Sequence, residues 1–139
     1  RSKLREEYVK GSFYCNLEVF RSLYHFVVRH MERSGQSVFL MLCTVTESNG
    51  MPPSNPARRK LFMQGMQEAI KAALRRGDAY TRYSPNQFLL LLMQIKQENC
   101  TVVADRLRHC FYGAAKQHNA ARLNCKSLSA ADVDFITPQ

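Results

Sequence analysis

Two almost uninterrupted apolar segments constrain the fold of this chain more than any other feature. Residues 37–46 (SVFLMLCTVT) are rich in β-branched and apolar side chains, and residues 88–93 (FLLLLM) are wholly apolar. Strands that are hydrophobic on both sides must be covered on both faces of their sheet. The two segments therefore predict two central strands of a sheet with helices packed against it.

Helical periodicity occupies the stretches between and around these strands. The first helix is expected from residue 17, where apolar residues begin to recur with a period near 3.6. Asn16 is placed to cap its start, and Gly35 is placed to end it. A second helix opens at Asn55-Pro56, a capping residue followed by proline at the first helical position, and Gly77 is expected to end it. A third helix is expected from about residue 99 to residue 116.

Two shorter strands complete the pattern. Residues 79–83 (AYTRY) are expected to form a short strand, and the Ser84-Pro85-Asn86 sequence after it has type I turn chemistry. Residues 122–128 alternate between polar and apolar side chains, which is typical of a half-exposed edge strand. Residues 47–55 (ESNGMPPSN) are dense in helix and strand breakers and predict a loop.

The resulting order, α-β-α-β-β-α-β, predicts an α+β sandwich. In a ferredoxin-like or nucleotidyl-cyclase-like fold the first and third strands are central, and here these are the two most apolar strands. The sheet is expected to be mostly antiparallel. At 139 residues the chain is expected to form one domain that folds without a disulfide or a metal. The expected divisions are a linker from an upstream region at 1–11, the domain at 12–128, and a C-terminal tail at 129–139.

Composition narrows the function further. No apolar run is long enough for a transmembrane helix, and the five cysteines form no CxxC pair, which favours a reducing cytoplasm. The four histidines show no zinc-like spacing, so no metal is expected. The net charge of +9 is spread along the chain without interleaved aromatic residues, so solvated helix faces and a phosphate-binding surface both stay open.

Residues 74–92 contain a series of motifs in a spacing that is typical of a known protein family. Arg75 and Asp78 form an R-x-x-D motif, Arg82 and Tyr83 end a short strand, and Ser84-Pro85-Asn86-Gln87-Phe88 follows before an apolar strand. This arrangement resembles the GGDEF (diguanylate cyclase) domain, in which Gly-Gly-Asp-Glu-Phe stands at 84–88, and residues 104–108 (ADRLR) resemble that family's next helix. The resemblance extends over residues 12–128 and implies the cyclase scaffold.

The same resemblance implies that the chemistry is lost. Magnesium ions in such sites need carboxylate ligands, and the family supplies acids at the end of the first strand and in the hairpin. Threonines Thr44 and Thr46 stand at the first of these places, and the amides Asn86 and Gln87 at the second. Ser84 and Pro85 replace the glycines whose backbone approaches the phosphates, and proline has no N–H group. We therefore expect a degenerate domain that is not an enzyme and holds no cofactor.

The retained Arg75 and Asp78, with Arg82 nearby, leave two interpretations. In the family, an R-x-x-D motif at this spacing holds the guanine and phosphate of cyclic di-GMP, and arginine suits such bidentate bonds. Alternatively, Arg75 favourably ends a helix and Asp78 makes a turn or pairs with a neighbouring arginine.

The start of the domain adds a second, looser resemblance. Residues 11–15 (GSFYC), which lead into Val19-Phe20-Arg21, resemble a variant found at the end of bacterial transcription regulators with an upstream SARP/BTAD-like portion. This implies a regulatory or protein-interaction domain that contacts neighbouring domains or a second copy, and that meets DNA only through another domain. The alternative function is a sensor of cyclic di-GMP or another guanine nucleotide, and a residual nucleotide-processing enzyme is a third possibility.

Overall fold

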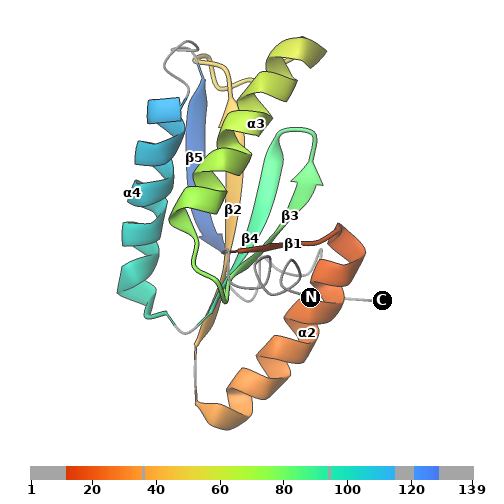
Figure 1. Cartoon of the computed structure of the whole chain (residues 1–139), viewed down its shortest axis with the longest axis vertical. Helices are drawn as coiled ribbons and strands as arrows, with labels where there is room; N and C mark the ends of the chain where they lie inside the picture. The colour runs from red at the N-terminus through yellow and green to blue at the C-terminus, as the bar shows by residue number, and fades with distance from the viewer. Residues whose placement is uncertain (1–11, 36, 94, 115–120, 129–139) are drawn as a thin grey trace, which may run out of the picture.

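The computed structural model describes residues 12–35, 37–93, 95–114 and 121–128. Within these ranges the elements follow in the order β1 (Phe13–Tyr14), α2 (Leu17–Ser34), β2 (Val38–Thr46), α3 (Pro56–Ala73), β3 (Ala79–Ser84), β4 (Gln87–Met93), α4 (Gln97–Ala114) and β5 (Arg122–Leu128). The strands form one sheet in the order β1-β3-β4-β2-β5 (Figure 1). None of the helices described is both long and apolar enough to cross a membrane.

The predicted α+β fold and its mostly antiparallel sheet are confirmed. β2 runs antiparallel to β4 and to β5, β3 and β4 form an antiparallel hairpin, and only the short β1 pairs in parallel, with β3. The two apolar strands, β2 and β4, are neighbours in the middle of the sheet. β1 was not predicted, because two exposed aromatic residues, Phe13 and Tyr14, carry no periodic signal.

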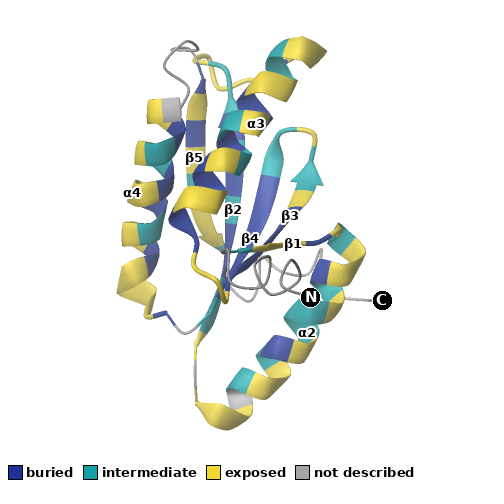
Figure 2. Cartoon of the chain, in the orientation of Figure 1, coloured by how far each residue is buried: buried dark blue, intermediate teal, exposed yellow. Residues whose placement is uncertain are grey.

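Helices cover both faces of the sheet, which explains why its central strands are apolar throughout. Successive side chains of a strand point to opposite faces. Met41, Cys43 and Val45 of β2 therefore pack under α3 and α4, whereas Leu40 packs with Phe20 of α2 on the other face. The buried stripe of each helix faces the sheet (Figure 2).

The predicted starts of α2 and α3 are confirmed by their capping hydrogen bonds. The Asn16 side chain accepts a hydrogen bond from the Val19 N–H at 2.9 Å, and Gly35 ends α2 in the left-handed conformation, with φ of 74°. The Asn55 side chain accepts from the backbone of Ala57 and Arg58, directly before Pro56. Such caps satisfy N–H groups that have no partner within the helix.

Other boundaries differ from the prediction. α3 ends at Ala73 and not at Gly77, because Leu74 turns to extended backbone and is buried in the core. α4 begins at Gln97, before the expected residue 99. Ser84 and Gln87 each lengthen a strand by one residue, which narrows the turn to Pro85-Asn86. The expected helical residues 115–116, the linker at 1–11 and the tail at 129–139 lie outside the described residues.

Candidate functional site

The β3–β4 hairpin meets the end of β2, and this junction contains most of the predicted degenerate positions. Thr44 of β2 is paired with Gln87 at the start of β4, and the Val45 N–H donates to the Asn86 carbonyl at 2.9 Å. Ser84 closes the hairpin opposite Gln87. Thr46 lies beyond Thr44, the last residue of β2 that pairs with β4, and it pairs only with Arg122 of β5 among the described residues.

Neutral side chains at this junction bind one another. The Gln87 amide donates to the Thr44 hydroxyl at 3.1 Å, and the Asn86 amide donates to the Val45 carbonyl at 3.0 Å. The Ser84 hydroxyl donates to the Gln87 side-chain oxygen at 2.9 Å. Two of these three bonds use an amide N–H, which a carboxylate does not have. The amides at 86 and 87 are therefore integrated into a hydrogen-bond network of their own.

Arg82 holds the turn from its outer side. Its guanidinium donates to the carbonyls of Ser84 and Pro85, at 2.9 Å each, and lies 5.6 Å from the ring centre of Phe88. The register also shifts between Arg82 and Ser84, so Tyr83 forms a bulge. Proline fixes φ near −65° and cannot adopt the positive φ of the commonest two-residue hairpin turns. The Pro85-Asn86 turn is therefore of a less common kind, and it occurs together with the bulge at Tyr83 and the two hydrogen bonds from Arg82.

The carboxylate that directly follows the end of β2 is already paired with a guanidinium. Glu47, just after β2, binds the guanidinium of Arg58 with an Oε2–Nε distance of 2.7 Å. This hydrogen bond raises the pKa of Arg58. Across the described ranges, no group of three or more His, Cys, Asp or Glu side chains is arranged to hold a metal ion. The residues at the hairpin do not fit the magnesium ions that a cyclase site needs.

At the other end of the same two strands, Arg75 and Asp78 lie together as the motif predicts. Asp78 is only 3% exposed. Its Oδ2 accepts from the Arg75 N–H at 2.9 Å and its Oδ1 from the Met93 N–H at 3.0 Å. The Arg75 guanidinium is 3.8 Å from the same carboxylate, is 58% exposed, and donates to the Met93 carbonyl. Asp78 therefore faces inward and joins the start of β3 to the end of β4.

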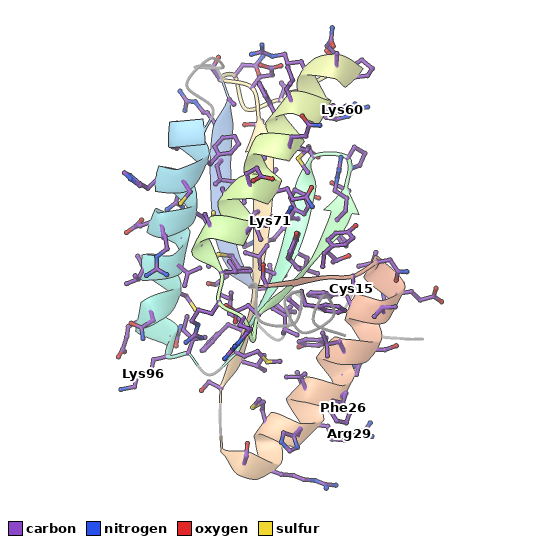
Figure 3. All side chains as sticks on the ribbon, in the orientation of Figure 1. Cys15, Phe26, Arg29, Lys60, Lys71 and Lys96 are labelled. Atoms are coloured by element: carbon purple, nitrogen blue, oxygen red, sulfur yellow. The ribbon has the colours of Figure 1, made fainter. Side chains whose placement is uncertain are left out.

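A cationic pocket between α3 and the hairpin was not predicted. It encloses about 350 Å³, and its charged side chains are Arg59, Lys60 and Arg82. The other lining residues are Pro56, Met63, Gln64 and Gln67. Lys60, which lines the pocket, lies on the first turns of α3 (Figure 3). The available signal was the Arg58-Arg59-Lys60 run at a helix start, where acids are the usual residues.

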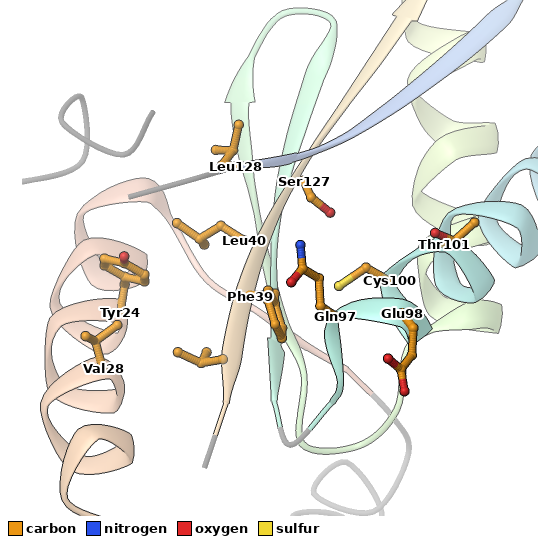
Figure 4. Close-up of a pocket in the computed structure, with 11 residues that line it drawn as sticks. Tyr24, Val28, Phe39, Leu40, Gln97, Glu98, Cys100, Thr101, Ser127 and Leu128 are labelled. Carbon is orange, nitrogen blue, oxygen red and sulfur yellow. The ribbon is translucent and has the colours of Figure 1, made fainter. Parts of the chain in front are cut away.

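A larger cavity, of about 710 Å³, lies elsewhere, around the first residues of β2 (Figure 4). Its lining is Tyr24, Val28, Val38, Phe39, Leu40, Gln97, Glu98, Cys100, Thr101, Ser127 and Leu128. Glu98 is the only carboxylate in this set, and no lysine, arginine or histidine accompanies it. Its residues offer no acid–base pair or anion site, so the hairpin end remains the candidate site.

Comparison with known proteins places the fold. No family model and no curated protein matches the sequence. Two solved structures are similar: a DGC protein from Thermotoga maritima (TM-score 0.65, 12% identity, 92% of this chain and 90% of that one) and the diguanylate cyclase SiaD from Pseudomonas aeruginosa, solved with its activator SiaC (TM-score 0.58, 17% identity, 92% and 54%). This chain thus spans about half of SiaD. At such identities the likeness concerns the fold, and that fold is the GGDEF-like fold of diguanylate cyclase domains.

Proposed function

We propose that this chain is a catalytically inactive GGDEF-like domain that acts through protein contacts. The observation that carries the proposal is the hairpin network of neutral groups, in which the Gln87 amide donates to the Thr44 hydroxyl and the Asn86 amide donates to the Val45 carbonyl. Joining two nucleotides through an α-phosphorus requires divalent metal to stabilise the developing charge. The hairpin supplies no carboxylate for such a metal, and Pro85 supplies no N–H for a phosphate.

The surface for protein contact is proposed on α2 and β1. Phe13, Tyr14, Val19 and Phe26 are exposed, and Phe26 reaches 69% exposure. Phe26 and Arg29 project from α2 (Figure 3), and the Phe26 ring stacks with His30 at a centroid distance of 6.3 Å. Exposed apolar side chains that gather on one part of a surface are typical of interaction sites.

The context that we propose is a bacterial transcription regulator, in the cytoplasm, with this domain beside SARP/BTAD-like regions. The proposed partners are the neighbouring domains of that regulator and a second copy of the chain, with DNA bound only by another domain. SiaD was solved with an activator protein, which makes a protein partner a reasonable proposal for a domain of similar fold.

Sedimentation equilibrium and pull-down with the neighbouring domains test this role. Phe26→Ser is expected to weaken self-association or domain contact, because it removes the most exposed large apolar side chain of α2. Val102→Ser, an exposed apolar residue on α4, is the matched control. Equal behaviour of the two variants and the parent would contradict the proposed surface.

A nucleotide sensor is the second candidate, and the cationic pocket and the exposed guanidinium of Arg75 favour it. Against it stands Asp78, whose two carboxylate oxygens are already bound by backbone N–H groups. Calorimetry with cyclic di-GMP and with GTP, each with and without Mg²⁺, separates the candidates. Absence of heat with either nucleotide supports the protein-contact role. Binding that is lost in Arg75→Ala, but retained in the control Lys71→Ala, supports the sensor.

A further inference from the structure

Two cysteines that are far apart in the sequence lie side by side on neighbouring strands of the sheet. Cys43 of the central strand β2 is the direct register partner of Cys125 on the edge strand β5. Their sulfur atoms are 3.8 Å apart, and both thiols are free. Directly opposite residues of antiparallel strands have Cβ atoms about 4.5–5.5 Å apart, and the Cβ atoms of a disulfide are about 3.5–4.5 Å apart, so the two ranges meet. A small side-chain rotation and strand shift would therefore bring the two sulfurs into bonding range.

The two thiols have unequal environments. Cys43 is 0% exposed within the core under α3 and α4, whereas Cys125 is partly exposed. The Cys43 thiol donates a hydrogen bond to the Cys125 sulfur, and this bond lowers the pKa of Cys125 and raises that of Cys43. Burial opposes the effect at Cys125, the positive charge of Arg108 adds to it, and Asp105, which pairs with Arg108 at 3.2 Å, opposes it.

We propose that Cys43 and Cys125 form a site of oxidative modification, at which a hydroperoxide converts the thiol pair into a cross-strand disulfide. The geometry assigns the attacking role to Cys125, which is partly exposed, and the resolving role to Cys43, which is fully buried and whose sulfur lies 3.8 Å away. Peroxide-sensitive pairs place the thiol that the oxidant can reach next to a resolving cysteine.

The chemistry balances in two steps. The Cys125 thiolate attacks the terminal peroxide oxygen, so an S–O bond forms and the O–O bond breaks. The departing oxygen takes up a proton and leaves as water from hydrogen peroxide, or as an alcohol from an organic hydroperoxide. The Cys43 sulfur then attacks the Cys125 sulfur, an S–S bond forms, and the sulfenic hydroxyl leaves as water with the Cys43 proton. The two thiols lose two electrons, and the hydroperoxide gains them.

The other described cysteines offer a comparison within the same molecule. Burial raises the pKa of Cys15 and of Cys100, which disfavours their thiolates. Cys110 on α4 is half-buried, as Cys125 is, and therefore serves as a matched control for access. Oxidation at 43 and 125 would also tie an edge strand to the middle of the sheet, across a long stretch of intervening chain.

The test is a thiol map of the full chain after brief exposure to hydrogen peroxide. The protein is quenched, denatured, alkylated and digested, and each cysteine is quantified by mass spectrometry. We expect a linked Cys43–Cys125 peptide pair that dithiothreitol reverses, a higher melting temperature of the oxidised protein, and Cys125 consumption about ten-fold faster than that of Cys110. The rate should fall as the pH is lowered through the pKa of Cys125, because the thiolate is the nucleophile.

Two variants sharpen the outcome. Cys43→Ala should leave a sulfenic acid at Cys125 that dimedone traps, and Cys110→Ala should form the disulfide at the parental rate. Equal oxidation of Cys110 and Cys125, or modification of Cys125 without any link to Cys43 in the parent protein, would overturn the proposal. The map of the parent protein decides the matter even where a variant does not fold.

Discussion

The β3–β4 pair is polar at both of its ends, and the two ends use different chemistry. At the hairpin, Asn86 and Gln87 are neutral and bind a carbonyl and a hydroxyl. At the opposite end, Asp78 is a buried carboxylate that accepts two backbone N–H groups. Both ends correspond to positions that the GGDEF resemblance associates with ligands, yet only one of them carries an acid.

The difference teaches what each polar residue does in this fold. Backbone N–H groups must have acceptors when they are buried, so the acid at 78 has a structural reason to persist. At the hairpin the available partners are a carbonyl and a hydroxyl, and amide donors satisfy them better than a carboxylate would. The chain therefore has a carboxylate at 78, where buried backbone N–H groups need an acceptor. It has neutral amides at 86 and 87, where metal-dependent catalysis would need carboxylates.

The largest effect on stability is expected from Asp78→Ala, which removes the buried carboxylate at the Asp78 end of the β3–β4 pair. The change leaves the N–H groups of Arg75 and Met93 without acceptors, and buried groups of this kind are costly when unpaired. We expect the free energy of unfolding to fall by about 3 kcal/mol, measured by urea denaturation. Asp105→Ala removes an exposed acid and should change it by less than about 0.5 kcal/mol. Equal losses in the two variants would contradict the structural role of Asp78.

Restoring an acid in the hairpin is expected to have an intermediate effect. Asn86→Asp replaces the N–H that faces the Val45 carbonyl with a carboxylate oxygen, so two acceptors meet. We expect a loss of roughly 1–2 kcal/mol in the free energy of unfolding at neutral pH. Gln87→Glu should lose only about 0.5 kcal/mol, because the Thr44 hydroxyl can rotate to donate. A stabilising Asn86→Asp would show that the network does not depend on the amide.

The smallest effect is expected midway between the two ends. Thr81 of β3 is fully buried, and its hydroxyl has no hydrogen-bond partner among the described residues. Thr81→Val keeps the shape and removes the unpaired group, so the free energy of unfolding should stay level or rise by up to about 1 kcal/mol. Thermal and urea unfolding measure this change. A clear loss of stability would mean that the hydroxyl is in fact satisfied.

Much of this fold was predictable from local signals. The segments 37–46 and 88–93 are apolar on both sides, which only the central strands of a sheet covered on both faces accommodate. Asn16 and Asn55 mark the starts of two helices through their capping side chains. β1 escaped prediction because its pairing with β3 comes from the tertiary fold. The end of α3 was misplaced because the burial of Leu74 and the backbone bonds of Asp78, and not Gly77, determine where the helix stops.

The candidate site was predictable in its residues and less so in its contacts. The resemblance to the GGDEF domain placed Thr44, Asn86 and Gln87 in one group, and the pairing of β2 with β4 brings them together. Spacing could not show that Asp78 faces inward or that Arg82 returns to its own turn, since both depend on which partners the packed chain leaves available. The Cys43–Cys125 contact depends on the register between β2 and β5, which has no local signature.

The proposed absence of cyclase chemistry is tested most directly by incubating the purified chain with GTP and Mg²⁺, and following products by liquid chromatography beside an active diguanylate cyclase. The account predicts no cyclic di-GMP above the protein-free control, with either Mg²⁺ or Mn²⁺, because the hairpin offers amides and a hydroxyl where metal ligands are needed. Formation of cyclic di-GMP that depends on the metal and stops when it is chelated would contradict the account.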